Sequence, residues 1–158
     1  MNKSSCYFFI CLVLMMVLSS SPLVNSKVVC PPFEAYAPCS CGEYFYQQGT
    51  ILLNCAFLNI NDSQASDILD IFLTTPDVSP LWDLDLSRNQ LNRIPAQINS
   101  FPQLKKVYLN NNNITSIDAG ALRFTDAANP AQHLWLYNNP MTTIAPGAFI
   151  GKTQFIFS

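Results

Sequence analysis

Three stretches of the chain share one spacing of leucines and asparagine. They are Leu81-Trp-Asp-Leu-Asp-Leu-Ser-Arg-Asn-Gln-Leu91, Leu104-Lys-Lys-Val-Tyr-Leu-Asn-Asn-Asn-Asn-Ile114 and Ala131-Gln-His-Leu-Trp-Leu-Tyr-Asn-Asn-Pro-Met141. Each fits L-x-x-L-x-L-x-x-N-x-L, except that the third has an alanine in place of the first leucine. An isoleucine follows each motif three residues later, at positions 94, 117 and 144. Three copies in the same phase favour a true repeat over coincidence in an apolar chain.

This spacing is the signature of leucine-rich repeats, whose period is roughly 20–29 residues. The central Leu-x-Leu predicts a short strand whose leucines point to one face and whose intervening residues point to the other. One repeat cannot bury its apolar face alone, so neighbouring repeats must stack. The asparagine lies where the chain leaves the strand, and its amide can bond the backbones of neighbouring turns. The sequence therefore predicts an α/β leucine-rich repeat solenoid with short parallel β-strands on its concave face.

Residues 1–26 are predicted to be a secretory signal peptide. Lys3 gives a positive start, Cys6 to Leu18 is an uninterrupted apolar run, and Val24 and Ser26 precede a cleavage site. The alternative is a membrane anchor, but this run is shorter than the roughly 18 residues that a membrane span needs. No other segment is long and apolar enough to span. The protein is therefore expected to be secreted and extracellular, with no membrane span.

Four cysteines remain after the predicted cleavage: Cys30, Cys39, Cys41 and Cys55. In a secreted protein an even number of cysteines indicates disulfides. Three pairings are possible, and a bond between Cys39 and Cys41 is disfavoured because these residues are so close in the chain. A zinc site is also disfavoured, because Cys39-Ser-Cys41 lacks the usual spacer. These cysteines predict a disulfide cap at the N-terminal end of the repeats.

The predicted organisation after the signal peptide has two parts. Residues 27–60 form the cysteine-rich N-terminal cap and the first strand, where Leu53-Asn-Cys-Ala-Phe-Leu-Asn-Ile60 repeats the strand motif imperfectly. Residues 61–158 hold the repeats, with full motifs from about 81, 104 and 131. Asp62 or Ser63 is a candidate N-cap for a convex-side helix over 63–73.

The C-terminal end has no recognisable cysteine cap, because no cysteine follows Cys55. The apolar residues Phe155, Ile156 and Phe157 are expected to lie near an open end of the stack. Three explanations remain: a truncated chain, self-association through this end, or an unusual apolar cap.

The composition argues against several functions. The formal net charge is −2, whereas binding to nucleic acid or to anionic membranes needs a basic surface. The chain lacks G-x-S-x-G and G-x-G-x-x-G, and its one histidine, His133, cannot form a histidine metal cluster. We therefore expect no enzymatic activity, no cofactor and no metal. A small hydrolase that uses Asp83, Asp85 and His133 is a remote alternative.

The predicted binding surface consists of residues that alternate away from the leucines on the concave face. It comprises Trp82, Asp83, Asp85, Arg88, Lys106, Tyr108, Asn110, His133, Trp135 and Tyr137, with Ser87 and Lys105 beside them. Placed side by side, the strands give the rows Asp83–Lys106–His133, Asp85–Tyr108–Trp135 and Ser87–Asn110–Tyr137. Exposed Trp and Tyr often anchor interfaces, which favours a protein partner of unknown identity. The alternative is that Tyr108 stacks on Trp135 while Asp83 neutralises Lys106.

Two glycosylation sequons follow predicted strands, Asn61-Asp-Ser63 and Asn113-Ile-Thr115. Both lie where the chain turns towards the convex side. A glycan at either Asn61 or Asn113 would therefore leave the concave face free.

The arrangement C-x8-C-x-C-x13-C resembles the N-terminal cysteine cap of extracellular leucine-rich repeat proteins. That resemblance implies the pairs Cys30–Cys41 and Cys39–Cys55. The stretches Ala37-Pro-Cys-Ser-Cys41, Asn61 to Asp70, Asp77-Val-Ser-Pro-Leu81 and Ile144-Ala-Pro-Gly-Ala-Phe149 resemble secreted arthropod leucine-rich repeat proteins, including a non-catalytic luciferase subunit. The resemblance implies an extracellular companion that binds and does not catalyse. The hypotheses are thus a protein-binding module or, as an alternative, the non-catalytic partner subunit of a secreted oxidative enzyme complex.

Overall fold

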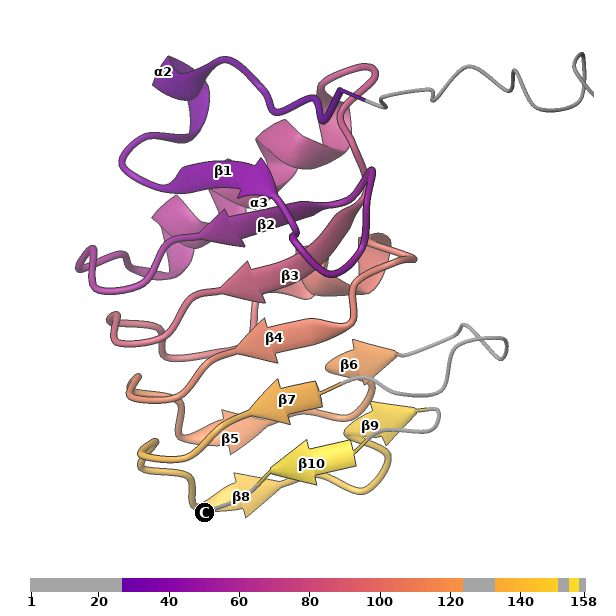
Figure 1. The fold of residues 1–158 in the computed structure, drawn as a ribbon. Helices are drawn as coiled ribbons and strands as arrows, with labels where there is room; N and C mark the ends of the chain where they lie inside the picture. Colours follow the sequence, from indigo (N-terminus) through magenta and orange to yellow (C-terminus); the bar gives the residue numbers. More distant parts are fainter. Residues whose placement is uncertain (1–26, 124–132, 151–153, 157–158) are drawn as a thin grey trace, which may run out of the picture.

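The computed structural model describes residues 27–123, 133–150 and 154–156. Its main sheet has six strands in the order β1-β2-β3-β4-β7-β10 (Figure 1). Their bounds are β1 Ser40–Glu43, β2 Ile51–Asn54, β3 Leu81–Asp85, β4 Lys106–Tyr108, β7 His133–Trp135 and β10 Gln154–Ile156. The predicted signal peptide, the first two positions of the third motif and Phe157 lie outside the described residues.

Within this sheet, β2, β3, β4, β7 and β10 pair in parallel, each with the next, as the repeat spacing predicts. Leu84 of β3 aligns with Val107 of β4, and Val107 aligns with Leu134 of β7. These three side chains are at most 2% exposed. Each apolar side chain that is fully removed from water stabilises the fold by about 1.5–3 kcal/mol, so successive repeats share one core.

The motif asparagines Asn89, Asn112 and Asn139 connect successive turns. The Asn89 amide nitrogen donates to the Cys55 carbonyl at 2.8 Å, and its oxygen accepts from the Ile60 amide at 3.0 Å. Asn112 and Asn139 repeat this arrangement one and two turns further along. The prediction that these amides bond neighbouring turns is therefore confirmed, and buried backbone groups find partners where the strands end.

A second layer covers the back of the sheet in Figure 1. It contains helix α3 (Asp62–Thr74), the 3-10 helix η1 (Ala96–Ser100), and two pairs of short parallel strands. The pairs are β5 (Ser116–Ile117) with β8 (Thr143–Ile144), and β6 (Leu122–Arg123) with β9 (Phe149–Ile150). Helix α3 buries Ala65, Ile68, Leu69 and Phe72 against this core.

The start of α3 differs from the prediction, which placed the N-cap at Asp62 or Ser63. The N-cap is Asn61, whose side-chain oxygen accepts from the Gln64 amide at 3.0 Å. The Gln64 side chain in turn accepts from the Asn61 amide at 3.0 Å. This capping box satisfies two backbone donors at once, which explains why the helix begins one residue earlier than expected.

The N-terminal segment contains helix α2 (Phe33–Tyr36) and strand β1, which pairs antiparallel with β2. The sequence did not predict β1, and it placed the first strand two residues too late. Disulfides join Cys30 to Cys41 and Cys39 to Cys55, so the implied pairing is confirmed. Cys39 and Cys55 are fully buried in the same core as the repeats. The segment is thus continuous with the repeats through both the sheet and the core.

Candidate functional site

The strands β3, β4 and β7 bring six predicted site residues together on one side of the sheet. Asp83 aligns with Lys106, which aligns with His133, and Asp85 aligns with Tyr108, which aligns with Trp135. These two of the three predicted rows are confirmed, whereas the row Ser87–Asn110–Tyr137 lies beyond the paired residues of β3, β4 and β7. We call this surface the strand face, formed by Asp83, Asp85, Lys106, Tyr108, His133 and Trp135. It faces the viewer in Figure 1.

The centre of the strand face is a stack of aromatic rings. The rings of Tyr108 and Trp135 lie 4.1 Å apart and only 9° from parallel. The imidazole of His133 stacks on Trp135 at 5.6 Å. Burial raises the pKa of Tyr108, with the nearby carboxyl of Asp83 acting in the same direction. The alternative prediction of a Tyr108–Trp135 stack is therefore confirmed, and the two half-buried rings form one fixed surface feature.

A buried polar cluster lies beside the ring stack. Asp83 is 5% exposed, and its Oδ1 atom has no hydrogen-bond partner. The pKa of Asp83 is raised from 3.8 to about 6, mainly by burial and also by the neighbouring Asp85, while Lys106 acts in the opposite direction. The Lys106 ammonium donates to the Tyr44 hydroxyl at 2.6 Å, and this bond raises the pKa of Lys106. Among the described residues no ion pair within 4.0 Å joins Lys106 to Asp83. Their charges still attract each other, because Lys106 lowers the pKa of Asp83 and Asp83 raises the pKa of Lys106.

The remaining predicted residues lie around this cluster. Trp82 is the extra residue where the register between β2 and β3 shifts, and the Lys105 ammonium lies 5.7 Å from its ring. Tyr137 is partly exposed and Arg88 is exposed. Lys105 and Asn110, predicted to point outward, are only 4% and 5% exposed. Asn110 lies beyond the end of β4, where the chain begins to turn and the strand alternation no longer applies.

The turn after each strand adds a further column, in which the sequence predicted Arg88 as a surface residue but not Phe57. Phe57, Arg88, Asn111 and Asn138 occupy equivalent places and all have φ between 55° and 65°. The Arg88 guanidinium lies 4.6 Å above the Phe57 ring, which is 71% exposed. An exposed aromatic side chain in a left-handed conformation is unusual. Because its exposed ring lies beside Arg88, Phe57 extends the candidate site along the edge where the strands end.

The β1–β2 loop contributes aromatic residues that the sequence assigned only to the cap. Tyr44 is buried against the sheet and stacks on Trp82 at 6.4 Å. The next two side chains, Phe45 and Tyr46, are 88% and 82% exposed. The run of three aromatics before Gln47-Gln-Gly49 was the available signal, because apolar rings in a turn favour contact over solvation.

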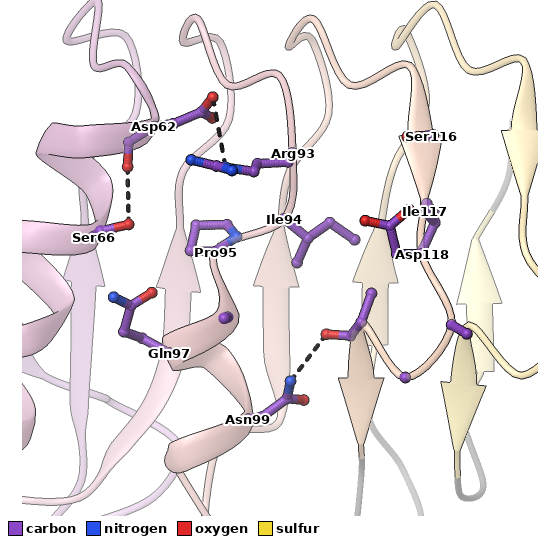
Figure 2. A pocket seen from close by; sticks show the side chains of 14 residues that line it. Asp62, Ser66, Arg93, Ile94, Pro95, Gln97, Asn99, Ser116, Ile117 and Asp118 are labelled. Carbon is purple, nitrogen blue, oxygen red and sulfur yellow. Dashed lines mark hydrogen bonds and ion pairs between the residues drawn. The ribbon is translucent and has the colours of Figure 1, made fainter.

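A hollow of about 390 Å³ lies on the opposite side of the molecule, between α3 and the segment after β4 (Figure 2). Its polar side chains contact each other. The Asp62 carboxylate lies 4.0 Å from the Arg93 guanidinium, and the Asn99 amide donates to the Ala121 carbonyl at 3.0 Å. Its lining therefore offers few unsatisfied groups. We assign the candidate site to the strand face, where a buried carboxylate oxygen and partly exposed rings occur together.

Both sequon asparagines, Asn61 and Asn113, are exposed. The side-chain oxygen of Asn61 is used in the capping box. Its nitrogen, to which a glycan would attach, makes no hydrogen bond with the described residues.

Residues 83–121 match the family model described as Leucine Rich repeats (2 copies). This segment runs from β3 through η1 and β4 to the turn after β5. This segment, a quarter of the chain, is similar to leucine-rich repeats. No curated protein and no solved structure matches the chain. Leucine-rich repeats generally serve as protein-interaction modules, with a surface built by stacking short units. In the part of the chain that the structure describes, no helix has the length and apolar character to cross a membrane.

Proposed function

We propose that the chain is a secreted protein-binding module whose partner docks on the strand face, the concave side of a leucine-rich repeat solenoid. The observation that carries this proposal is the stack of Tyr108 on Trp135 at 4.1 Å. Both rings are only partly buried on an open sheet surface. A docking protein would remove their remaining apolar area from water, which is the commonest source of affinity at protein interfaces.

The rigidity of the stack supports the same role. Each ring is held by its neighbour and by a parallel strand, so little side-chain freedom would be lost on binding. Asp85 and His133 flank the stack and can add directional hydrogen bonds. An apolar centre with polar neighbours is the usual arrangement of a protein interface.

Secretion is supported by the two disulfides and by the predicted signal peptide, since disulfides persist mainly in oxidising compartments. The disulfide-linked segment would then act as the cap on the first repeat. The narrower role of non-catalytic partner subunit in a secreted oxidative enzyme complex is supported by the sequence resemblance, and the identity of a captured partner would decide it.

The test is capture of a partner from the source tissue with the tagged protein, followed by quantification with Tyr108→Ala/Trp135→Ala. We expect the amount captured to fall at least about tenfold, because two anchoring rings are lost. The matched control is Phe33→Ala, since Phe33 is 59% exposed on α2, beyond β1 and away from the strand face. Circular dichroism would verify folding. Equal capture by the double variant would contradict the proposal.

A further inference from the structure

The β1–β2 loop, residues 44–50, lies in front of the sheet at the level of β3 (Figure 1). Its own backbone closes it, because the Tyr44 amide donates to the Thr50 carbonyl at 2.9 Å and the Gln47 amide donates to the Tyr44 carbonyl at 3.1 Å. Tyr44 turns towards the sheet, whereas Phe45 and Tyr46 point into solvent. Tyr44 therefore faces the sheet in a loop that exposes two other large rings.

The attachment is a bond between distant parts of the chain. The Lys106 ammonium donates to the Tyr44 hydroxyl at 2.6 Å and lies 5.2 Å from the Tyr44 ring. Tyr44 also contacts Trp82 at 6.4 Å. The buried phenol of Tyr44 thus holds the loop against β3 and β4.

Asp83 offers Lys106 a second acceptor. It is the residue opposite Lys106 in the pairing of β3 with β4, and its Oδ1 atom is buried without a partner. A carboxylate forms a stronger bond with an ammonium group than a neutral phenol does. A buried carboxylate oxygen without a donor is also costly. Lys106 therefore lies between a hydroxyl that it contacts and a carboxylate that lacks a donor.

We propose that Lys106 alternates between two acceptors, the Tyr44 hydroxyl when the β1–β2 loop lies against the sheet and the Asp83 carboxylate when the loop moves away. Movement of the loop uncovers Asp83 and Trp82 and changes the position of Phe45 and Tyr46 beside the strand face. The use of that uncovered surface for docking rests on the proposed function. The exchange of Lys106 between its two acceptors is independent of the proposed function, because it occurs in the free protein.

Protonation of Asp83 biases the exchange. The titratable groups that act on this carboxyl are Lys106 and Tyr108 of β4 and Asp85 of β3, and Tyr44 of the loop contacts Lys106. Because the pKa of Asp83 is raised to about 6, the carboxyl is mostly neutral at pH 5 and mostly charged at pH 7.5. The charged form competes for Lys106, so the loop opens more often at the higher pH.

The test is hydrogen–deuterium exchange of the Tyr44 and Thr50 amides in the purified chain without a partner, corrected for the intrinsic pH dependence of exchange. Tyr44→Phe keeps the ring and removes the acceptor, so we expect these amides to exchange about five- to tenfold faster. Asp83→Asn removes the charged competitor, so exchange of these amides at pH 7.5 should slow. The difference between their corrected exchange rates at pH 7.5 and at pH 5 should then disappear. Tyr46→Phe, an exposed change in the same loop, should alter neither.

Unchanged exchange in Tyr44→Phe, or faster exchange in Asp83→Asn, would overturn the two-acceptor proposal. Because no partner is present, this result is independent of the capture experiment with Tyr108→Ala/Trp135→Ala. A failed exchange test would leave the docking proposal standing. Failed capture would likewise leave the acceptor exchange standing.

Discussion

Asn112 and Asp83 are both polar, both 5% exposed and both carried by the same repeated motif, yet only Asn112 is fully bonded. Its nitrogen donates to the Leu86 and Leu109 carbonyls at 3.0 Å, and its oxygen accepts from the Leu91 amide at 3.1 Å. Asp83 keeps one buried oxygen without a donor. The Asn112 position recurs in each repeat, so neighbouring backbone always supplies its partners. The surroundings of Asp83 depend on Tyr44, which lies outside the repeats.

The largest expected effect is on the repeated position. Asn112→Ala removes four hydrogen bonds, the longest of them 3.5 Å, and leaves buried backbone groups without partners, so the free energy of unfolding should fall by about 3 kcal/mol. Urea denaturation of both chains measures the difference. The neighbouring Asn113 is exposed, and Asn113→Ala should change stability by less than about 0.5 kcal/mol. A loss below about 1 kcal/mol for Asn112→Ala would mean that the hydrogen bonds of Asn112 contribute little to stability, so that Asn112 and Asp83 differ less than their bonding suggests.

The next effect concerns Asp83 and depends on pH. Its pKa is raised from 3.8 to about 6 in the folded chain, so the folded chain holds this proton more tightly than the unfolded chain. Stability therefore decreases as pH rises from about 4 to about 7. Compared with Asp83→Asn, the native chain should lose about 2 kcal/mol across this range, since one pKa unit corresponds to about 1.4 kcal/mol.

Thermal or urea unfolding at pH 4, 5.5 and 7 tests this prediction, with Asp85→Asn as the comparison variant, which should keep most of the pH dependence because Asp85 is the smallest of the causes that shift the pKa of Asp83. Asp85 is on the same strand but is partly exposed and accepts from the Ser87 amide at 2.9 Å. Parallel pH profiles for the native chain and Asp83→Asn would show that Asp83 is as well accommodated as Asn112.

The same contrast separates what the sequence could predict from what it could not. The bonding of Asn89 and Asn112 and the rows of the strand face follow from the spacing within one repeat. The local sequence pattern was therefore sufficient to predict the asparagine bonds and the rows. The bond from Lys106 to Tyr44 joins residues 62 positions apart and depends on the path of a loop with no repeat to guide it. The burial of Asn110 was missed for a related reason, because it lies just past the end of its strand.

The N-cap of α3 is an intermediate case. Asn61, Asp62 and Ser63 all have side chains that favour this position, so residue type alone did not choose among them. Only Asn61 has a glutamine three residues later, and that pair forms the observed capping box. The deciding signal was therefore present in the sequence, whereas for Tyr44 the only signal was an aromatic run whose contacts no local rule specifies.

The smallest expected effect compares a contact between repeats with a contact from the loop. A double-mutant cycle on Tyr108 and Trp135, with each changed to Ala singly and together, should give a coupling of about 1 kcal/mol for rings stacked at 4.1 Å. The same cycle on Tyr44 and Trp82, whose rings are 6.4 Å apart, should give less than about 0.5 kcal/mol. Both pairs lie on the same side of the sheet. The register of two repeated strands holds Tyr108 against Trp135, whereas Tyr44 belongs to a loop. Equal couplings would mean that the loop holds its rings as firmly as the repeats do, and the Tyr44 contact would then be a fixed part of the face.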